Sequence, residues 1–322
     1  LVILSDGSSS NTIIDANSDF RAIGIYGSSA VTINGFTIIN GRASDCNDGC
    51  DGAGIYISST GTVNLNNLII SNNLAASTGG GIYIASPADV TVNACKIYSN
   101  EAVDYGGGIG SRSDKTIIKN SLIYDNKTSG NDGGGIDAEK TFVLINSALI
   151  RNSVPDARYG AAIRVSTSLD SVLIFNTVFY DNYGGENYSS DDGIYLNNGK
   201  LVMFNNYLNK EEDNGGLLIE RGSGNIFSNS DPFTSSANND FRLNNIDLFE
   251  SGLSSVLMNG ITYSAPSTDI DGNSRPNPSN TPPDMGAYEG VTLPDVTPPS
   301  MPTEVVALAA DKKVSFTWKG NK

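Results

Sequence analysis

Three charged side chains, Asp125, Arg151 and Asp181, are the strongest catalytic candidates, because each comes one residue before an asparagine in a polar turn. If these turns stack in consecutive coils, the two carboxylates lie about 9–10 Å apart, near the upper range for an inverting glycosidase. Arg151 between them would keep both acids ionised, which removes the proton donor. An alternating ion-pair ladder is therefore the simpler interpretation, and a two-acid hydrolase is the alternative.

Histidine is absent from the 322 residues, which excludes mechanisms that use imidazole as base, acid or metal ligand. Proton abstraction would instead need basic side chains close together. The candidates do not visibly converge in the sequence; they are Lys96, Arg112, Lys115, Lys119 and Lys127.

The turns collect acidic residues, and the best group for a cation is Asp45, Asp48 and Asp51. Calcium accepts carboxylate and carbonyl oxygens in flexible geometry, so this loop is a candidate calcium site, with a solvated acidic edge as the alternative. Residues 269–273 show similar alternation but lack the other positions of an EF-hand, which favours a structural turn. No residue pattern requires a cofactor, and the only bound ion that the sequence suggests is calcium.

Four tyrosines fall in the same turns: Tyr105, Tyr159, Tyr183 and Tyr188. Exposed aromatic rings can stack on the apolar faces of sugars, and nearby hydroxyls can orient them. We predict a glycan-binding edge, and the alternative is that the rings fold back over the corners of the fold.

The cysteines indicate a local disulfide. Cys46 and Cys50 share a polar loop, and no second pair completes a four-cysteine metal site. A Cys46–Cys50 disulfide would point to an oxidising compartment. Cys95 lies in an apolar stretch and is predicted to be a buried free thiol.

The composition favours strands and a surface that suits the outside of a cell. Hydrophobic residues make up 39% of the chain, and 35 glycines favour strands joined by turns. The net charge of -15 makes nucleic acid an improbable partner. No apolar run approaches the roughly 20 residues of a membrane span. Residues 1–4 read as a strand already in progress, so we expect a targeting segment further upstream.

A fixed period organises most of the chain. A small residue followed by isoleucine recurs at offsets of 27 to 31 residues, at Ile25, Ile55, Ile82, Ile109, Ile136, Ile163 and Ile194. A second landmark follows short apolar runs, at Asn34, Asn66, Asn93, Asn120, Asn146, Asn176 and Asn205. A third apolar segment in each period precedes another polar turn.

Three short strands per period that close on themselves make a parallel β-helix, with equivalent residues stacked about 4.8 Å apart. We predict an all-β, single-stranded parallel β-helix (a solenoid with three strands per coil) over residues 1–233, with the seven isoleucines in one column. Stacked asparagines can satisfy one another's amides, so the seven asparagines are interpreted as a structural ladder, and ligand binding is the alternative.

The period weakens after about residue 227. Residues 234–290 are predicted to form a degenerate coil and a short irregular C-terminal cap over the end of the helix. A proline-rich linker at 291–302 and two strand-like segments within 303–322 follow.

The glycine–isoleucine and asparagine turns resemble the right-handed parallel β-helix superfamily over roughly residues 1–230. This superfamily includes pectate-lyase-like enzymes and surface adhesins, and the resemblance implies a right-handed coil without naming a reaction. Residues 269–276 (DIDGNSRP) and 283–289 (PDMGAYE) resemble a signature that closes β-helix domains of the choice-of-anchor type in large secreted bacterial proteins. Residues 303–322 resemble the start of a fibronectin type III domain, which implies a modular, longer parent chain.

These observations favour a secreted or cell-surface bacterial scaffold, adhesin-like and non-catalytic, that binds a glycan or a cell-surface protein through its loop edges. The alternative is a polysaccharide lyase or glycoside hydrolase that acts on an extracellular polysaccharide.

Overall fold

The computed structural model describes the whole chain except residues 45–48, 86, 114, 156–157, 185–192, 210–218, 291–302, 311–312 and 320–322. It divides into two units, residues 1–290 and residues 291–322. The helical segments that the structure describes are short 3-10 turns, and none of them has the length and apolar character that a membrane crossing requires.

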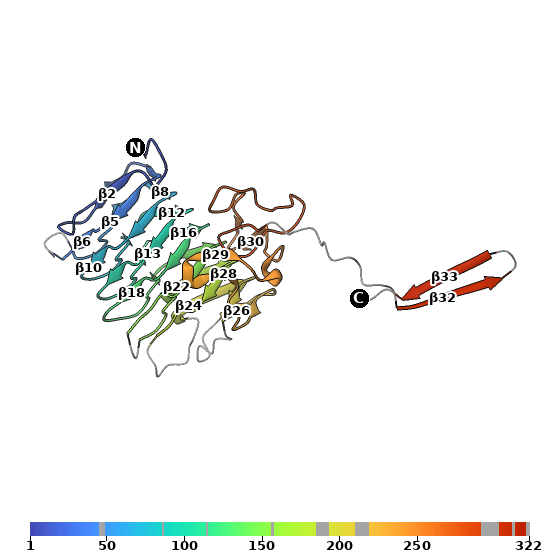
Figure 1. Cartoon of the computed structure of the whole chain (residues 1–322). Coiled ribbons are helices and arrows are strands. Elements are labelled where there is room, and N and C mark those ends of the chain that lie inside the picture. The colour runs from blue at the N-terminus through green and yellow to red at the C-terminus, as the bar shows by residue number, and fades with distance from the viewer. Residues whose placement is uncertain are drawn as a thin grey trace. The chain divides into compact units, whose positions relative to one another are not determined.

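Parallel strands of the first unit stack in rows, and one strand from each row makes a coil (Figure 1). Row A contains β3 (Ile23–Gly27), β7 (Ile55–Ser59), β11 (Ile82–Ile84), β15 (Ile109–Ser111), β19 (Ile136–Ala138) and the first parts of β22 (Ile163–Phe175) and β24 (Ile194–Phe204). Row B contains β1 (Val2–Leu4), β4 (Val31–Asn34), β8 (Thr62–Asn66), β12 (Asp89–Asn93), β16 (Lys115–Lys119), β20 (Phe142–Ile145), the second parts of β22 and β24, and β26 (Ile219–Arg221).

The third side of each coil is row C, and a short fourth row lies at one corner. Row C contains β2 (Ile13–Asp15), β5 (Thr37–Ile39), β9 (Ile69–Ser71), β13 (Lys96–Tyr98), β17 (Leu122–Tyr124), β21 (Ala148–Ile150), β23 (Val178–Tyr180), β25 (Tyr207–Leu208) and β27 (Ile226–Phe227). Row D contains β6 (Arg42–Ala43), β10 (Leu74–Ala75), β14 (Glu101–Ala102) and β18 (Lys127–Thr128). The predicted all-β parallel solenoid is confirmed, with these two-residue strands added to the three per coil.

Isoleucines fill the interior of row A because β-branched side chains suit the pleated inner face of stacked strands. Six of the seven predicted isoleucines stack in single file from Ile55 to Ile194. The seventh, Ile25, pairs with Ile57, and Ile23 takes the predicted place over Ile55. A shift of two residues keeps a side chain on the same face, so Ile25 still points inward.

Asparagines fill the corner between rows C and D. Each amide nitrogen donates to the amide oxygen one coil further along, from Asn73 to Asn100 at 2.9 Å and then through the following residues to Asn182 at 3.0 Å. These side chains are at most 2% exposed. The buried ladder is therefore made of the asparagines of the third polar turn: Asn73, Asn100, Asn126, Asn152 and Asn182.

The seven asparagines predicted as one ladder occupy two adjacent positions at the corner between rows B and C. Asn34, Asn66 and Asn93 end their strands in register, but Asn93 lies opposite Lys119, one residue before Asn120. The other four have left-handed backbones with φ between 43° and 53°; they are Asn120, Asn146, Asn176 and Asn205. Asparagine is favoured there because it tolerates this conformation better than most residues.

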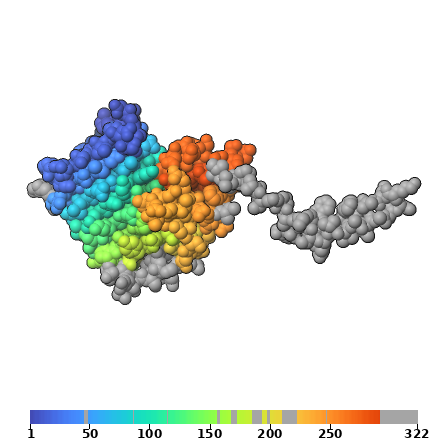
Figure 2. Space-filling model, in the orientation of Figure 1, coloured from blue at the N-terminus to red at the C-terminus, as the bar shows by residue number. Residues whose placement is uncertain are grey.

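Residues 233–290, the C-terminal cover, lie along the side of the coils, whereas the sequence predicts them over the end. The cover contains β28 (Phe233–Ser235), η2 (Ser236–Asn238), β29 (Asp240–Leu243), η3 (Ile246–Leu248), β30 (Ser255–Met258) and β31 (Ile261–Ser264). One apolar cluster joins it to the outer side of row C, and another joins it to row B. Figure 2 shows the orange cover lying directly on the green coils.

The second unit contains one antiparallel pair, β32 (Thr303–Ala310) with β33 (Lys313–Lys319). These are the two segments that the sequence predicts as strands, and the fibronectin type III assignment stays a prediction.

We expect the substitution Asn126→Ala to lower the free energy of unfolding by roughly 3 kcal/mol, because it leaves buried groups without partners. The Asn126 amide donates to the Ile97 carbonyl at 2.9 Å and to Asn152 at 3.0 Å, and its oxygen accepts from Asn100 at 3.0 Å. Urea unfolding measures the loss. Asn64→Ala, on the outer side of β8, is the control, and equal losses in the two variants would contradict the ladder's role.

Candidate functional site

The structure brings Asp125 and Arg151 together as an ion pair at the corner after row C. Arg151 donates from Nε and Nη2 to the two Asp125 oxygens at 2.8 and 2.7 Å. The same guanidinium donates to the carbonyl of Ser236 and, at 2.5 Å, to the side chain of Asn239. Arg151 thus ties the C-terminal cover to the coil, and its donors are engaged by protein groups.

Asp181, the third member of the predicted constellation, lies in the next coil with a left-handed backbone like the other two. Burial raises the pKa of Asp181, Arg151 lowers it, and Asp231 and Asp125 raise it further. The guanidinium faces Asp125 with both of its parallel donors, so the geometry is that of a bidentate ion pair at a docking point.

The left-handed asparagines hold the C-terminal cover by its backbone. Their amide nitrogens donate to cover carbonyls at distances of 2.6 to 2.8 Å, in the pairs Asn120 to Thr268, Asn146 to Asp284, Asn176 to Leu253 and Asn205 to Ser251. Asn176 also accepts from the Leu253 amide at 2.7 Å. These four asparagines therefore bind the backbone of the cover through hydrogen bonds, much as a neighbouring strand would.

The two signature segments, residues 269–276 and 283–289, meet in a buried ion pair. Arg275 donates to Glu289 at 2.8 Å and to the Asn120 oxygen at 2.8 Å, and the Arg275 and Glu289 side chains are 0% and 1% exposed. Asp269 accepts from the amides of Asp271 and Asn273. These two segments thus form a clamp that closes the cover onto the coil of β15, β16 and β17, and residues 269–273 form the predicted structural turn.

The outer residues of row C change from partly polar to apolar along the chain. This change indicates the cover in the sequence, and the sequence-based prediction did not use it. The outer positions are partly polar in the early strands, with Thr37 in β5 and Lys96 in β13. From β17 onward they are apolar and mostly buried, with Leu122, Ala148 and Val178 at the same register. Apolar residues on both sides of a strand indicate that both sides are covered.

Row A carries a second group of side chains on its outer side. The outward positions in register are Tyr56, Tyr83, Gly110, Asp137, Arg164 and Tyr195. With the adjacent Tyr26 and Arg112 we call this group the row A ladder. The two apolar clusters of the C-terminal cover involve rows B and C.

The first half of the row A ladder is aromatic. The ring centroids of Tyr26 and Tyr56 lie 5.8 Å apart, and those of Tyr56 and Tyr83 lie 5.5 Å apart. Arg21 lies 4.4 Å over the Tyr56 ring, and Arg112 donates to the Tyr83 hydroxyl at 2.8 Å. Tyr26 is 61% exposed, so it offers the accessible ring of this stack.

The second half of the row A ladder is charged. Arg164 bonds Asp137 at 2.6 Å, lies 3.4 Å from Asp132 and covers the Tyr105 ring at 4.6 Å from its centroid. One oxygen of Asp137 and the Nε of Arg164 are buried without a hydrogen-bond partner. Burial raises the pKa of Asp137 to about 6, although Arg164 lowers it.

Two of the predicted tyrosines are half-buried against the row A ladder, and one stays accessible. Tyr105 lies under Arg164, and Tyr159 stacks on Tyr195 with centroids 4.6 Å apart. Tyr183 is 57% exposed. Tyr188 lies outside the described residues.

The predicted calcium and disulfide sites fall largely outside the described residues, which leave out Asp45, Cys46 and Asp48. Asp51 accepts from the Thr78 amide at 2.9 Å. In the described part of the chain, no group of three or more acids and cysteines is placed to hold a metal. Both sites stay predictions, whereas Cys95 is a buried free thiol, and burial raises its pKa to about 12.

The basic residues considered for a lyase lie in different rows. Lys96 is on β13 in row C, and Lys115 and Lys119 are at the two ends of β16 in row B. Lys127 pairs with Glu101 at 3.0 Å and Arg112 with Glu139 at 2.9 Å. They therefore form no common basic centre.

Residues 21–232 match the family described as "Right handed beta helix region", so the chain belongs to this family. No curated protein and no solved structure matches the chain.

We expect Arg275→Met to lower the free energy of unfolding by about 3 kcal/mol or more, because it leaves Glu289 charged and buried without its partner. Lys127→Met breaks the ion pair with Glu101, in which the lysine is 56% exposed, and is the matched control with a loss of about 0.5 kcal/mol. Urea unfolding gives both values, and hydrogen exchange over residues 246–290 locates the change. Unchanged exchange in Arg275→Met would contradict the clamp.

The raised pKa of Asp137 predicts a pH dependence of stability. In the folded state this acid holds its proton up to about pH 6, whereas the unfolded value is near 3.8, so its contribution to stability falls as the pH rises between these values. Urea unfolding from pH 4 to pH 7 compares the wild type with Asp137→Asn. We expect the wild type to lose roughly 2–3 kcal/mol relative to the variant across this window. Parallel curves would contradict the assignment.

Proposed function

We propose that this β-helix protein is a non-catalytic scaffold outside the cell, at the bacterial surface or secreted, that binds a glycan along the row A ladder. The observation that carries the proposal is the ladder itself, a line of stacked rings, guanidinium groups and carboxylates. The absence of histidine and the net charge of -15 support a binding protein with a solvated surface.

The chemistry of the row A ladder suits a hydroxyl-rich polymer. Phenol rings supply apolar contact, and the half-exposed pair of Arg112 with the neighbouring Glu139 supplies a donor and an acceptor for sugar hydroxyls. Successive coils are one strand apart, about 4.8 Å, so a chain that lies along the helix axis passes the accessible members Tyr26, Tyr56, Arg164 and Tyr195 in turn, whereas Tyr83 and Asp137 are buried beneath. Repeated weak contacts of this kind add up to useful affinity.

A neutral glycan fits better than a polyanion. Arg112 and Arg164 already have carboxylate partners, Glu139 for the first and Asp132 and Asp137 for the second. A uronate polymer would have to compete with these acids and with the negative charge of the whole chain. We therefore expect neutral sugars to be preferred.

A polysaccharide lyase or glycoside hydrolase is the second candidate, and Asp137 is the observation in its favour. Its raised pKa, close to neutral pH, is typical of acids that donate a proton, and Asp132 and Glu139 supply carboxylates in the same charged half. Reducing-sugar and unsaturated-product assays test this candidate. Product formation that Asp137→Asn abolishes would replace the scaffold proposal by an enzymatic one.

The parent protein we propose is modular. A fibronectin type III module would begin at residue 303, after the proline-rich linker, and the signature clamp would end the β-helix domain before it. Calcium at the loop of Asp45, Asp48 and Asp51 belongs to the same proposal, since divalent cations are common in acidic surface loops of extracellular proteins.

The row A ladder is tested on a glycan array, followed by calorimetric titration with the strongest array ligand. We expect Tyr26→Ala to weaken binding by about tenfold, because it removes the most exposed ring of the stack. Tyr98→Ala is the matched control, since Tyr98 also stacks on a tyrosine, with a centroid distance of 4.7 Å to Tyr124, but lies in row C. Equal affinities of the two variants, or no array ligand for the wild type, would overturn the proposal.

A further inference from the structure

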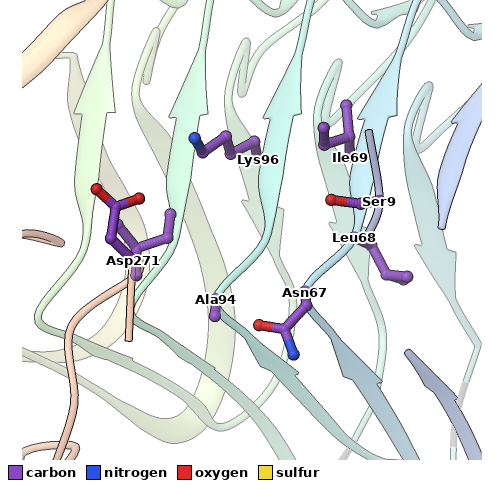
Figure 3. A pocket seen from close by; sticks show the side chains of 8 residues that line it. Ser9, Asn67, Leu68, Ile69, Ala94, Lys96 and Asp271 are labelled. Carbon is purple, nitrogen blue, oxygen red and sulfur yellow. The ribbon is translucent and has the colours of Figure 1, made fainter. Parts of the chain in front are cut away.

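A pocket of about 270 Å³ opens where the C-terminal cover ends on row C. Figure 3 shows Ser9 on one side, Asp271 of the cover on the other and Lys96 of β13 between them. Ile69 and Ile270 supply apolar surface. The pocket therefore combines segments from the start, the middle and the end of the first unit.

The pocket lies where the column of left-handed residues at the corner between rows B and C changes from asparagine to alanine. Asn120 holds the cover through Thr268, but the preceding member of the column is Ala94, with φ of 54° and no amide to offer. Ala94 lines the pocket, and Asn67 beyond it donates to Asn34 at 2.7 Å. No asparagine holds the cover at this position, and a recess remains between the cover and the loop of Ser9.

Two opposite charges face the recess without pairing to each other. Lys96 takes part in no ion pair within the described part of the chain, and Figure 3 shows its amine pointing towards the side that Asp271 lines. Asp271 has a long contact of 3.5 Å with Arg242, whose side chain is 62% exposed. A ligand in the pocket can thus accept from Lys96 and donate to Asp271.

We propose that this pocket is a subsite for a single neutral pyranose residue. A sugar ring carries hydroxyls that both donate and accept, and its C–H face can lie against Ile69 and Ile270. The volume is below the range of about 300–1,000 Å³ typical of drug-sized ligands, which suits one ring. Asp271 disfavours a uronate or phosphate group in the same place. The subsite lies on row C, so it does not rest on the row A ladder.

Saturation-transfer NMR and titration with methyl β-D-glucopyranoside, the β-galactoside and the β-mannoside test the proposal, with methyl β-D-glucuronide as the anionic probe. We expect Lys96→Met and Asp271→Asn each to weaken binding of the neutral probe by about tenfold, the loss expected for a hydrogen bond to a charged group. Both side chains are at the surface of the pocket, and thermal melting verifies that the variants fold.

Lys115→Met is the matched control, because Lys115 begins β16 in row B and does not line the pocket. The inference is overturned if the wild type binds none of the neutral pyranosides, if Lys96→Met binds them as the wild type does, or if the glucuronide binds more tightly than the glucoside.

Discussion

The coils that the structure describes from Asn73 to Asn182 have polar groups at their corners that only the neighbouring coils can satisfy. At the corner between rows C and D, one buried asparagine per coil donates to the asparagine after it and to a backbone carbonyl of the coil before it, as Asn126 does with Asn152 and Ile97. A buried amide without such partners costs several kcal/mol, so the ladder holds only when equivalent residues lie directly over one another. The aliphatic columns, the outer faces and the docking of the cover all depend on that register.

Asparagine serves a different purpose at the corner between rows B and C. There the backbone must take a left-handed turn. The side chain points to the outside of the coil, and it can bind another segment there. From Asn120 to Asn205 that segment is the C-terminal cover, which places carbonyl groups along the column. The cover also hides the apolar outer positions of β17, β20, β21 and β22, which could not face water in such numbers without promoting association.

Register also explains the arrangement of the outward polar groups. In a parallel β-helix, one outward position per coil becomes a line parallel to the axis, so single residues such as Tyr56, Tyr83 and Arg164 belong to one continuous surface. The fixed spacing and the stacking between neighbours hold these side chains in place, so the glycan binding that we propose would have a low entropic cost. A long, regular ligand is the natural match for such a line, whereas a recess like that beside Lys96 suits one small group.

The sequence by itself determined the all-β parallel solenoid and the position of six isoleucines in one column, because both follow from a local pattern repeated at a nearly constant interval. It also determined the buried state of Cys95, because this residue lies in an apolar stretch. Tertiary structure alone decided which asparagines stack, since one residue of offset between Asn93 and Asn120 is invisible in a period that varies by several residues. It also decided that the cover lies along the side and that Arg151 serves to dock it. Those contacts join residues 46 to 155 positions apart, such as Asn205 with Ser251 and Asn120 with Arg275, and no periodic signal links such distant segments.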